Sequence, residues 1–138
     1  MRRLVDEQRL SARIHIESAG TGSWHVGDLA DARARAAALA RGYKLDRRAQ
    51  QFTSRFFDRF DYVLAADDDN REHLSRLAPD ENAAKKIHLL REFDATSPKG
   101  SDVPDPYYGG PEGFERVLDI CEAACRGLLD HLVRELDR

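Results

Sequence analysis

The hydrophobic and polar residues of this chain follow two alternating periods, which predicts strands interleaved with helices. Apolar runs or strict alternation mark strands at 13–18, 61–67 and 86–93. Helical spacing marks the segments 2–10, 28–43, 54–60, 69–79 and the chain from Phe114 onward. This order favours an α/β fold of three layers, in which helices cover both faces of a parallel sheet.

The last helix is predicted to bury one stripe of side chains. Its apolar residues recur at helical spacing: Phe114, Val117, Leu118, Cys121, Cys125, Leu128, Leu132 and Leu136. Because both cysteines belong to this stripe, we interpret them as small buried hydrophobic residues. Elsewhere, Gly42 is predicted to end one helix and Thr53 to cap the start of another.

Composition and charge restrict the classes of protein to which the chain can belong. Its 138 residues suit a single domain, 1–138, and 41% hydrophobic with 34% charged residues is typical of a globular sequence. A net charge of −3 gives no basic surface for nucleic acid, and no apolar run reaches the length of a membrane span. The start lacks the apolar core of a signal peptide, so a cytoplasmic location is expected. The five histidines show no metal-ligand spacing, and no cofactor is expected.

Candidate chemistry lies in loops that follow predicted strands, because parallel α/β sheets place their sites beyond the carboxyl ends of strands. One such loop, "DPYYGG", combines Asp105 with Tyr107 and Tyr108. Asp105 has two interpretations: the start of a turn, or a general acid whose pKa an aromatic environment raises. The two tyrosines are interpreted either as partial core packing or as the wall of a pocket for a flat substrate group.

Two other loops also leave alternatives open. In "SAGTGSW", Trp24 is either an indole that anchors the loop to the core or a stacking surface at the mouth of a site. The glycines of this loop are a weak signal for dinucleotide binding. The run "DDDN", 67–70, is either a helix start, where acids suit the helix dipole, or a Mg²⁺ site.

Taken together, the segments "IESAGTGSWHVGDLADARA", "FDYVLAADDDN", "LLREFD" and "DPYYGG" resemble the low-molecular-weight protein tyrosine phosphatases. The resemblance runs from about Met1 to Leu136, in order and with the family's spacing. Arsenate reductases of the same fold are similar in outline, but "DPYYGG" favours the phosphatase branch. The resemblance implies an enzyme that hydrolyses a phosphotyrosine protein or another phosphomonoester through a cysteinyl-phosphate intermediate.

The resemblance also assigns roles around the substrate. It implies that Asp105 protonates the leaving tyrosyl oxygen and later acts as base on the attacking water. Trp24 and Tyr107 are expected to flank the ring of phosphotyrosine. Tyr107 and Tyr108 match positions that are themselves phosphorylated in some members of the family.

A supporting network behind the phosphate-binding loop is implied as well. Ser18 matches a serine that supports this loop by hydrogen bonding, and Asp67 matches a carboxylate of the same network. Arg47 stands where members of the family often have His. The network of this chain therefore departs from the family's pattern at one partner.

The family's nucleophile is a cysteine in a Cys-x5-Arg loop, where backbone N–H groups and a helix dipole lower the pKa of the thiol. The 138 residues contain no such loop, since Gly127 lies six residues beyond Cys121 and His131 lies six beyond Cys125. Met1 matches a position inside the family's first helix. We therefore expect the first central strand and the nucleophile loop to be absent from the chain as given, which is predicted to be inactive.

Other functions are compatible with parts of the sequence. A non-catalytic relative would bind phosphotyrosine or a partner protein without turnover. A receiver-like signalling domain would use the acids at 67–70 with Mg²⁺, but it lacks a suitably placed lysine and gives "DPYYGG" no role. The choice between phosphotyrosine, phosphoarginine and other substrates depends on the residues of the nucleophile loop, and the sequence leaves the oligomeric state open.

Overall fold

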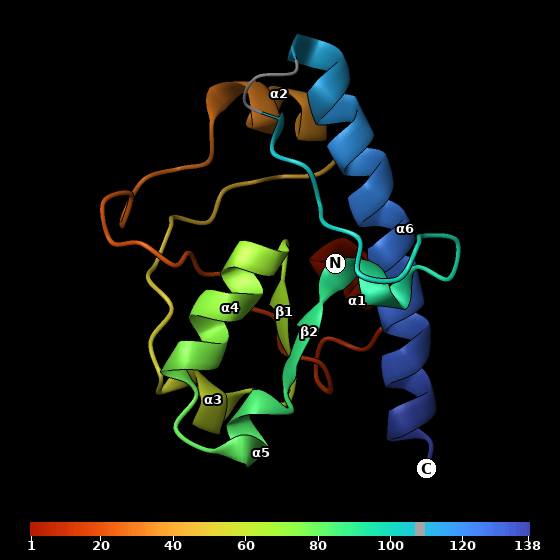
Figure 1. Cartoon of the computed structure of the whole chain (residues 1–138). Helices are drawn as coiled ribbons and strands as arrows, with labels where there is room; N and C mark the ends of the chain where they lie inside the picture. The colour runs from red at the N-terminus through yellow and green to blue at the C-terminus, as the bar shows by residue number, and fades with distance from the viewer. Residues whose placement is uncertain (107–109) are drawn as a thin grey trace.

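The computed structural model describes residues 1–106 and 110–138 as a mixed structure of helices around a small sheet (Figure 1). Tyr107, Tyr108 and Gly109 lie outside the described residues. In chain order the elements are α1 (Arg2–Glu7), α2 (Ala32–Ala40), α3 (Phe56–Arg59), β1 (Val63–Ala65), α4 (Asp68–Leu77), α5 (Glu81–Ala84), β2 (Ile87–Leu89), the 3₁₀ helix η1 (Leu90–Phe93) and α6 (Gly110–Leu136).

The sheet is parallel and lies between two layers of helices. Strands β1 and β2 pair in the register Val63↔Ile87, Leu64↔His88 and Ala65↔Leu89. Helix α4 connects the strands and packs against both, while α6 contacts α1, α2 and η1. Figure 1 shows α4 on one side of the strands and α1 and α6 on the other. The predicted α/β class with a parallel sheet and three layers is therefore confirmed.

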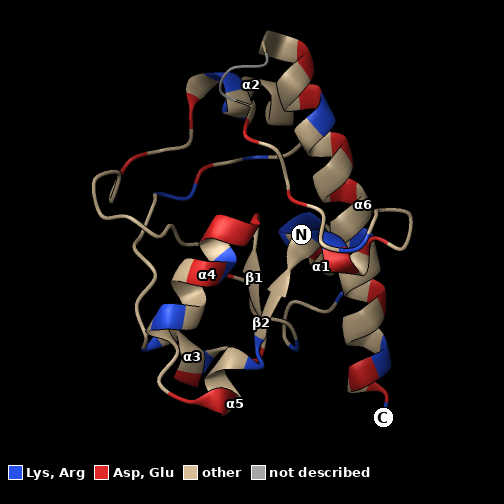
Figure 2. Ribbon diagram, viewed as in Figure 1, with Lys and Arg blue, Asp and Glu red and all other residues tan. Residues whose placement is uncertain are grey.

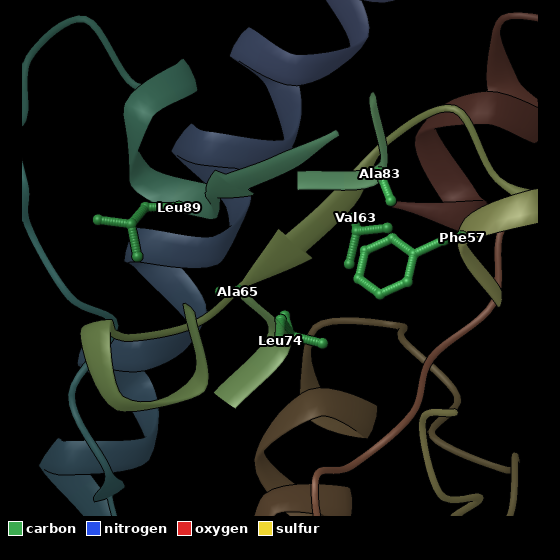
Figure 3. Close-up of a cluster of buried hydrophobic side chains, with 6 residues drawn as sticks. All are labelled: Phe57, Val63, Ala65, Leu74, Ala83 and Leu89. Atoms are coloured by element: carbon green, nitrogen blue, oxygen red, sulfur yellow. The ribbon is translucent and has the colours of Figure 1, made fainter. Parts of the chain in front are cut away.

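The hydrophobic core lies between β1 and the helices α3, α4 and α5. Its buried side chains come from these elements and from β2 (Figure 3): Phe57, Val63, Ala65, Leu74, Ala83 and Leu89. Alternate residues of a strand share a face, and both Val63 and Ala65 are buried here, next to Leu74 of α4. The packing of β1 against α4 thereby holds the turn between them, residues 66–67, beside the start of α4.

The predicted strand at 13–18 is wrong. Residues 14–19 have no regular structure, and Ile14 and Ile16 are only half-buried. An apolar alternation becomes a strand only when a neighbouring edge accepts its backbone hydrogen bonds. Among the described residues, no strand pairs with this segment, and the nearest pairing is one isolated parallel bridge between Gly20 and Gln51.

Of two predicted helix boundaries, one is confirmed and the other is wrong. Gly42 follows α2 with a φ of +84°, the left-handed conformation that glycine adopts at the end of a helix, as predicted. The cap at Thr53 is wrong, since α3 begins after Arg55 and has no side-chain cap. The carbonyl of Thr53 instead accepts the Phe56 amide at 3.0 Å, which forms a turn ahead of the helix.

Helix α6 is longer than predicted and begins at Gly110. Its buried residues include Phe114 and Leu128 of the predicted stripe, but also Ala124 and Leu129 outside it. The remaining residues of the stripe are half-buried, because α6 packs against separate helices along its length. Although α6 has 27 residues, no helix in the described part of the chain is long and apolar enough to cross a bilayer.

An ionic contact joins α2 to α6 near the start of the long helix. The Arg41 guanidinium lies 2.5 Å from the Glu115 carboxylate, 2.9 Å from that of Asp119 and 2.8 Å from that of Glu122. These carboxylates raise the pKa of Arg41, with the hydrogen bond that Arg41 donates to Glu122 as the largest cause. Figure 2 shows acidic and basic residues interspersed along the outer surface of α6. Arg41 therefore stabilises the position of α2, which has few buried side chains of its own.

Helix α6 lies close to the main chain of η1 at Gly127. A Cβ built on Gly127 would overlap the carbonyl oxygen of Phe93 and lie 2.8 Å from its carbonyl carbon. Because the obstructing atoms belong to the main chain of Phe93, helix α6 itself has to move to make room for the added methyl group. We expect Gly127→Ala to lower the free energy of unfolding by about 3 kcal/mol, measured by urea denaturation with circular dichroism.

Gly113, in the same helix, is the matched control for this substitution. A Cβ there would lie 3.5 Å from the Pro106 oxygen, which is an ordinary contact. Gly113→Ala is therefore expected to be neutral or to stabilise the protein by about 0.5–1 kcal/mol, since alanine favours helix. Equal effects of the two substitutions would contradict the packing described at Phe93.

Candidate active site

The loop that follows η1 and ends in Asp105 is fastened to the carboxyl end of β1. The amide of Val103 donates to the carbonyl of Ala66 at 2.8 Å. At the start of α4, two residues after Ala66, the amide of Asp68 donates to the Asp102 carboxylate at 3.0 Å. These two bonds place the acid loop, residues 94–106, at the edge of the sheet where parallel α/β folds carry their sites.

The other end of the acid loop is held by its own polar residues. The Asp94 carboxylate accepts hydrogen bonds from the Thr96 amide at 3.0 Å, the Thr96 hydroxyl at 2.7 Å and the Ser97 hydroxyl at 2.9 Å. These bonds, led by that of the Thr96 hydroxyl, lower the pKa of Asp94. The Arg91 guanidinium reaches across the loop to the Asp102 carbonyl at 2.7 Å. The turn that leads toward Asp105 is therefore fixed at several points.

The sequence analysis missed the residues that hold this loop. The pattern Asp-x-Thr-Ser at 94–97 is a signal that could have identified the turn, since a short carboxylate often accepts from the backbone two residues on. No comparable signal exists for Arg91 and Asp102, because their partners are distant in the sequence: Arg91 donates to the Asp102 carbonyl, and the Asp102 carboxylate accepts from the amide of Asp68 in α4. Of the residues that the sequence predicted for this site, Asp105 is exposed at the end of the loop, and Tyr107 and Tyr108 lie outside the described residues.

The acids at 67–70 form the start of α4. The Asp67 carboxylate accepts the Asn70 amide at 2.8 Å and thereby caps the helix. Asp68 forms an ion pair with Arg71 one turn further along. This is the helix start that the sequence analysis gave as one of two interpretations of the run. The next residue, Asp68, donates its amide to the acid loop. The N-cap of α4 at Asp67 therefore lies directly beside the point where the acid loop is bound.

Ser18 lies in an exposed stretch that pairs with the segment 48–52. Its carbonyl accepts the side-chain amide of Gln50 at 2.8 Å. Within the part of the chain that the structure describes, no hydrogen bond joins Ser18 to Asp67. The supporting network that the resemblance implies for these two residues therefore stays a prediction.

Arg47 takes part in a cluster of charges at the edge of this stretch. The Glu17 carboxylate lies 3.2 Å from His15, 3.9 Å from Arg47 and 4.0 Å from Arg2. These side chains, apart from Glu17, also line a hollow beside α1. Arg47, which stands where the resemblance predicts His, therefore lies beside the carboxylate of Glu17 on the protein surface.

Trp24 is 79% exposed, so its interpretation as an anchor in the core is wrong and that of a stacking surface remains. The loop around it is fastened at both ends. At the start, Gly20 donates to Gln50 and accepts from Phe52, both at 2.8 Å. At the end, the Gly27 amide donates to Ala49 at 2.8 Å. A rigid frame therefore presents an aromatic surface to solvent.

The Trp24 loop and the acid loop are separate in this structure. Figure 1 shows residues 20–28, in orange, beyond α4, whereas the acid loop runs close to α6. The structure thus places Asp105 and Trp24 on two different loops, the first fastened beside β1 and the second to residues 49–52.

Neither cysteine has the surroundings of a nucleophile. Both lie half-buried in the middle of α6, far from a helix N-terminus. Burial raises the pKa of the Cys121 thiol, and Cys125 raises it further. A phosphatase needs the opposite shift, because the thiolate is the reactive form. Their interpretation as hydrophobic residues of the helix agrees with this environment.

Comparison with known proteins identifies what this arrangement is similar to. The family model "Low molecular weight phosphotyrosine protein phosphatase" matches residues 1–138. A low molecular weight protein-tyrosine-phosphatase of Streptomyces coelicolor is 47% identical over 126 residues, which are 91% of this chain and 77% of that protein. Low molecular weight protein-tyrosine phosphatase A of Mycobacterium tuberculosis is 38% identical over 130 residues, 94% of this chain and 77% of the relative.

Solved structures show the same similarity. A crystal structure of a protein tyrosine phosphatase from Entamoeba histolytica, with Hepes in the active site, superposes with a TM-score of 0.91 at 37% identity. The superposition covers 97% of this chain and 85% of that one. YfkJ from Bacillus subtilis gives a TM-score of 0.87 at 32% identity, over 97% of this chain and 82% of its own.

Proposed function

Because the chain belongs to the low molecular weight phosphotyrosine protein phosphatase family, we propose that it provides the acid loop and the aromatic wall of a protein tyrosine phosphatase. The family match over residues 1–138 is the observation that carries this proposal. The fastening of the acid loop at Ala66 and Asp68 supports it, since a general acid has to be held in reach of one atom of the substrate. The substrates are phosphotyrosine proteins.

In the proposed reaction a thiolate attacks the phosphorus of phosphotyrosine while the bond to the tyrosyl oxygen breaks. Asp105 gives its proton to that oxygen, so tyrosine leaves as the neutral phenol. Water then attacks the phosphoenzyme, the Asp105 carboxylate takes a proton from it, and the sulfur–phosphorus bond breaks. Inorganic phosphate is released, and the thiolate and the protonated Asp105 are restored.

The remaining residues of the site bind and orient the substrate. Trp24, Tyr107 and Tyr108 flank the aromatic ring of the substrate, and Ser18 and Asp67 support the loop that holds the phosphate. The thiolate itself comes from a Cys-x5-Arg loop that these 138 residues do not contain. We place the reaction in the cytoplasm, because a catalytic thiolate requires a reducing compartment and both cysteines of the described chain are free.

A fusion protein tests the proposal. A strand and a Cys-x5-Arg loop of the family's pattern, placed ahead of Met1, supply the nucleophile. We expect this fusion to release phosphate from a phosphotyrosine peptide and not from the same peptide with phosphoserine. Folding of the fusion is established first by circular dichroism. A folded fusion that binds the phosphotyrosine peptide without turnover would instead support a non-catalytic binding protein.

A further inference from the structure

Between the two fastened ends of its loop, the Trp24 indole folds back over the main chain at Gly22. A Cβ built on Gly22 would overlap the six-membered ring of the indole and lie 2.7 Å from Cζ2, and its three nearest atoms all belong to that ring. Gly22 is not in the left-handed conformation, so its backbone would accept an alanine. The indole is therefore the nearest obstacle to a side chain at this position.

The same indole borders a shallow hollow in the surface. Besides Gly22 and Trp24, the hollow is lined by Gly20, Thr21, His25, Val26, Ala49 and Gln50 and has a volume of about 220 Å³. The indole is exposed, and within residues 1–106 and 110–138 its one aromatic neighbour is His25, edge to face at 6.3 Å. The contact with Gly22 is thus a close constraint on the orientation of the ring.

We propose that Gly22 is a positioning residue, which keeps the Trp24 indole folded against the main chain and the adjoining hollow open to a flat aromatic group. The identity of that group as a phosphotyrosine ring rests on the proposed function. The position of the indole does not, because it follows from the contact with Gly22. Any side chain at position 22 would push the ring away from the main chain.

Fluorescence tests this directly, because Trp24 is the only tryptophan of the chain. We expect Gly22→Ala to lower the steady-state anisotropy of tryptophan emission and to increase quenching by acrylamide, since the ring loses its fixed place. Gly20→Ala is the matched control: a Cβ there meets nothing within 4 Å, and both glycines lie in the same loop. Unchanged anisotropy and quenching in Gly22→Ala would overturn the proposal.

A thermodynamic cycle covers the case in which Gly22→Ala also lowers stability. In a Trp24→Ala background the indole is gone, so the substitution at Gly22 is expected to have no effect on the urea midpoint. A loss of stability that persists without the indole would overturn the proposal, because the obstacle would then lie elsewhere.

The consequence for catalysis is measured in the fusion protein. Gly22→Ala is expected to raise KM for a phosphotyrosine peptide while kcat is retained, whereas Ser23→Ala, at an exposed residue of the loop that does not line the hollow, changes neither. If the parent fusion shows no hydrolysis, the proposed function fails, and the anisotropy measurement still decides the role of Gly22. A lowered anisotropy in Gly22→Ala with an unchanged KM would support the positioning role and contradict the assignment of Trp24 to the substrate.

Discussion

The 138-residue polypeptide by itself is expected to release no p-nitrophenol from p-nitrophenyl phosphate above the rate in buffer. In the proposed mechanism its acid loop supplies a general acid, which contributes only about 10²–10⁴-fold to a reaction, whereas enzymes reach accelerations of about 10⁶-fold or more. The larger part depends on the thiolate and the phosphate-binding loop, and neither cysteine of α6 supplies them. Burial raises the pKa of the Cys121 thiol, which reduces its reactive form at neutral pH.

The control for this result is the same polypeptide with Asp105→Asn. Both are purified alike and assayed at several stages of purification, so that a contaminating phosphatase is recognised by its separation from the protein. Turnover that follows the polypeptide through every stage and is lost in Asp105→Asn would contradict the expectation. It would mean that these residues hold a nucleophile outside the Cys-x5-Arg pattern.

The second large effect concerns Asp105 in the fusion protein. Asp105→Asn is expected to lower kcat for a phosphotyrosine peptide by about 10²–10⁴-fold, because an amide cannot protonate the departing oxygen. Binding of the peptide should change little, since the side chain keeps its size and its polarity. Steady-state kinetics with the phosphotyrosine peptide measure both quantities.

Asp102 provides the matched control, three residues earlier in the acid loop. Its carboxylate accepts the Asp68 amide at 3.0 Å, and asparagine retains an oxygen that can accept the same bond. Asp102→Asn is therefore expected to lower kcat far less than Asp105→Asn. A comparable loss in both variants would show that the loop responds to any change of charge and would contradict a specific role for Asp105.

Much of the fold was predictable because β1, α4 and β2 have strong local patterns. The apolar run at 61–67 and the acids at the start of α4 define a buried strand and a capped helix without reference to distant residues. The segment 13–18 has an equally clear alternation, yet it forms no strand. Pairing depends on a neighbouring edge, which the alternation of one segment does not reveal.

The candidate site was predictable to a smaller extent. Asp105 and Trp24 were identified from their neighbours in the sequence, and the exposure of Trp24 follows the alternative given for a stacking surface. The bonds that hold the acid loop join Arg91, Asp102 and Val103 to partners that only the folded chain brings near. The contact between Gly22 and the indole was likewise hidden, because glycine has many reasons to occur in a loop.

The most direct test of Asp105 as general acid compares two leaving groups in the fusion protein. Tyrosine leaves as a phenol with a pKa of about 10 and needs the proton, whereas p-nitrophenol, a stronger acid, departs readily as its anion. We expect Asp105→Asn to reduce kcat/KM far more for the phosphotyrosine peptide than for p-nitrophenyl phosphate. An equal reduction for both substrates would show that Asp105 acts on folding or binding and does not protonate the leaving oxygen.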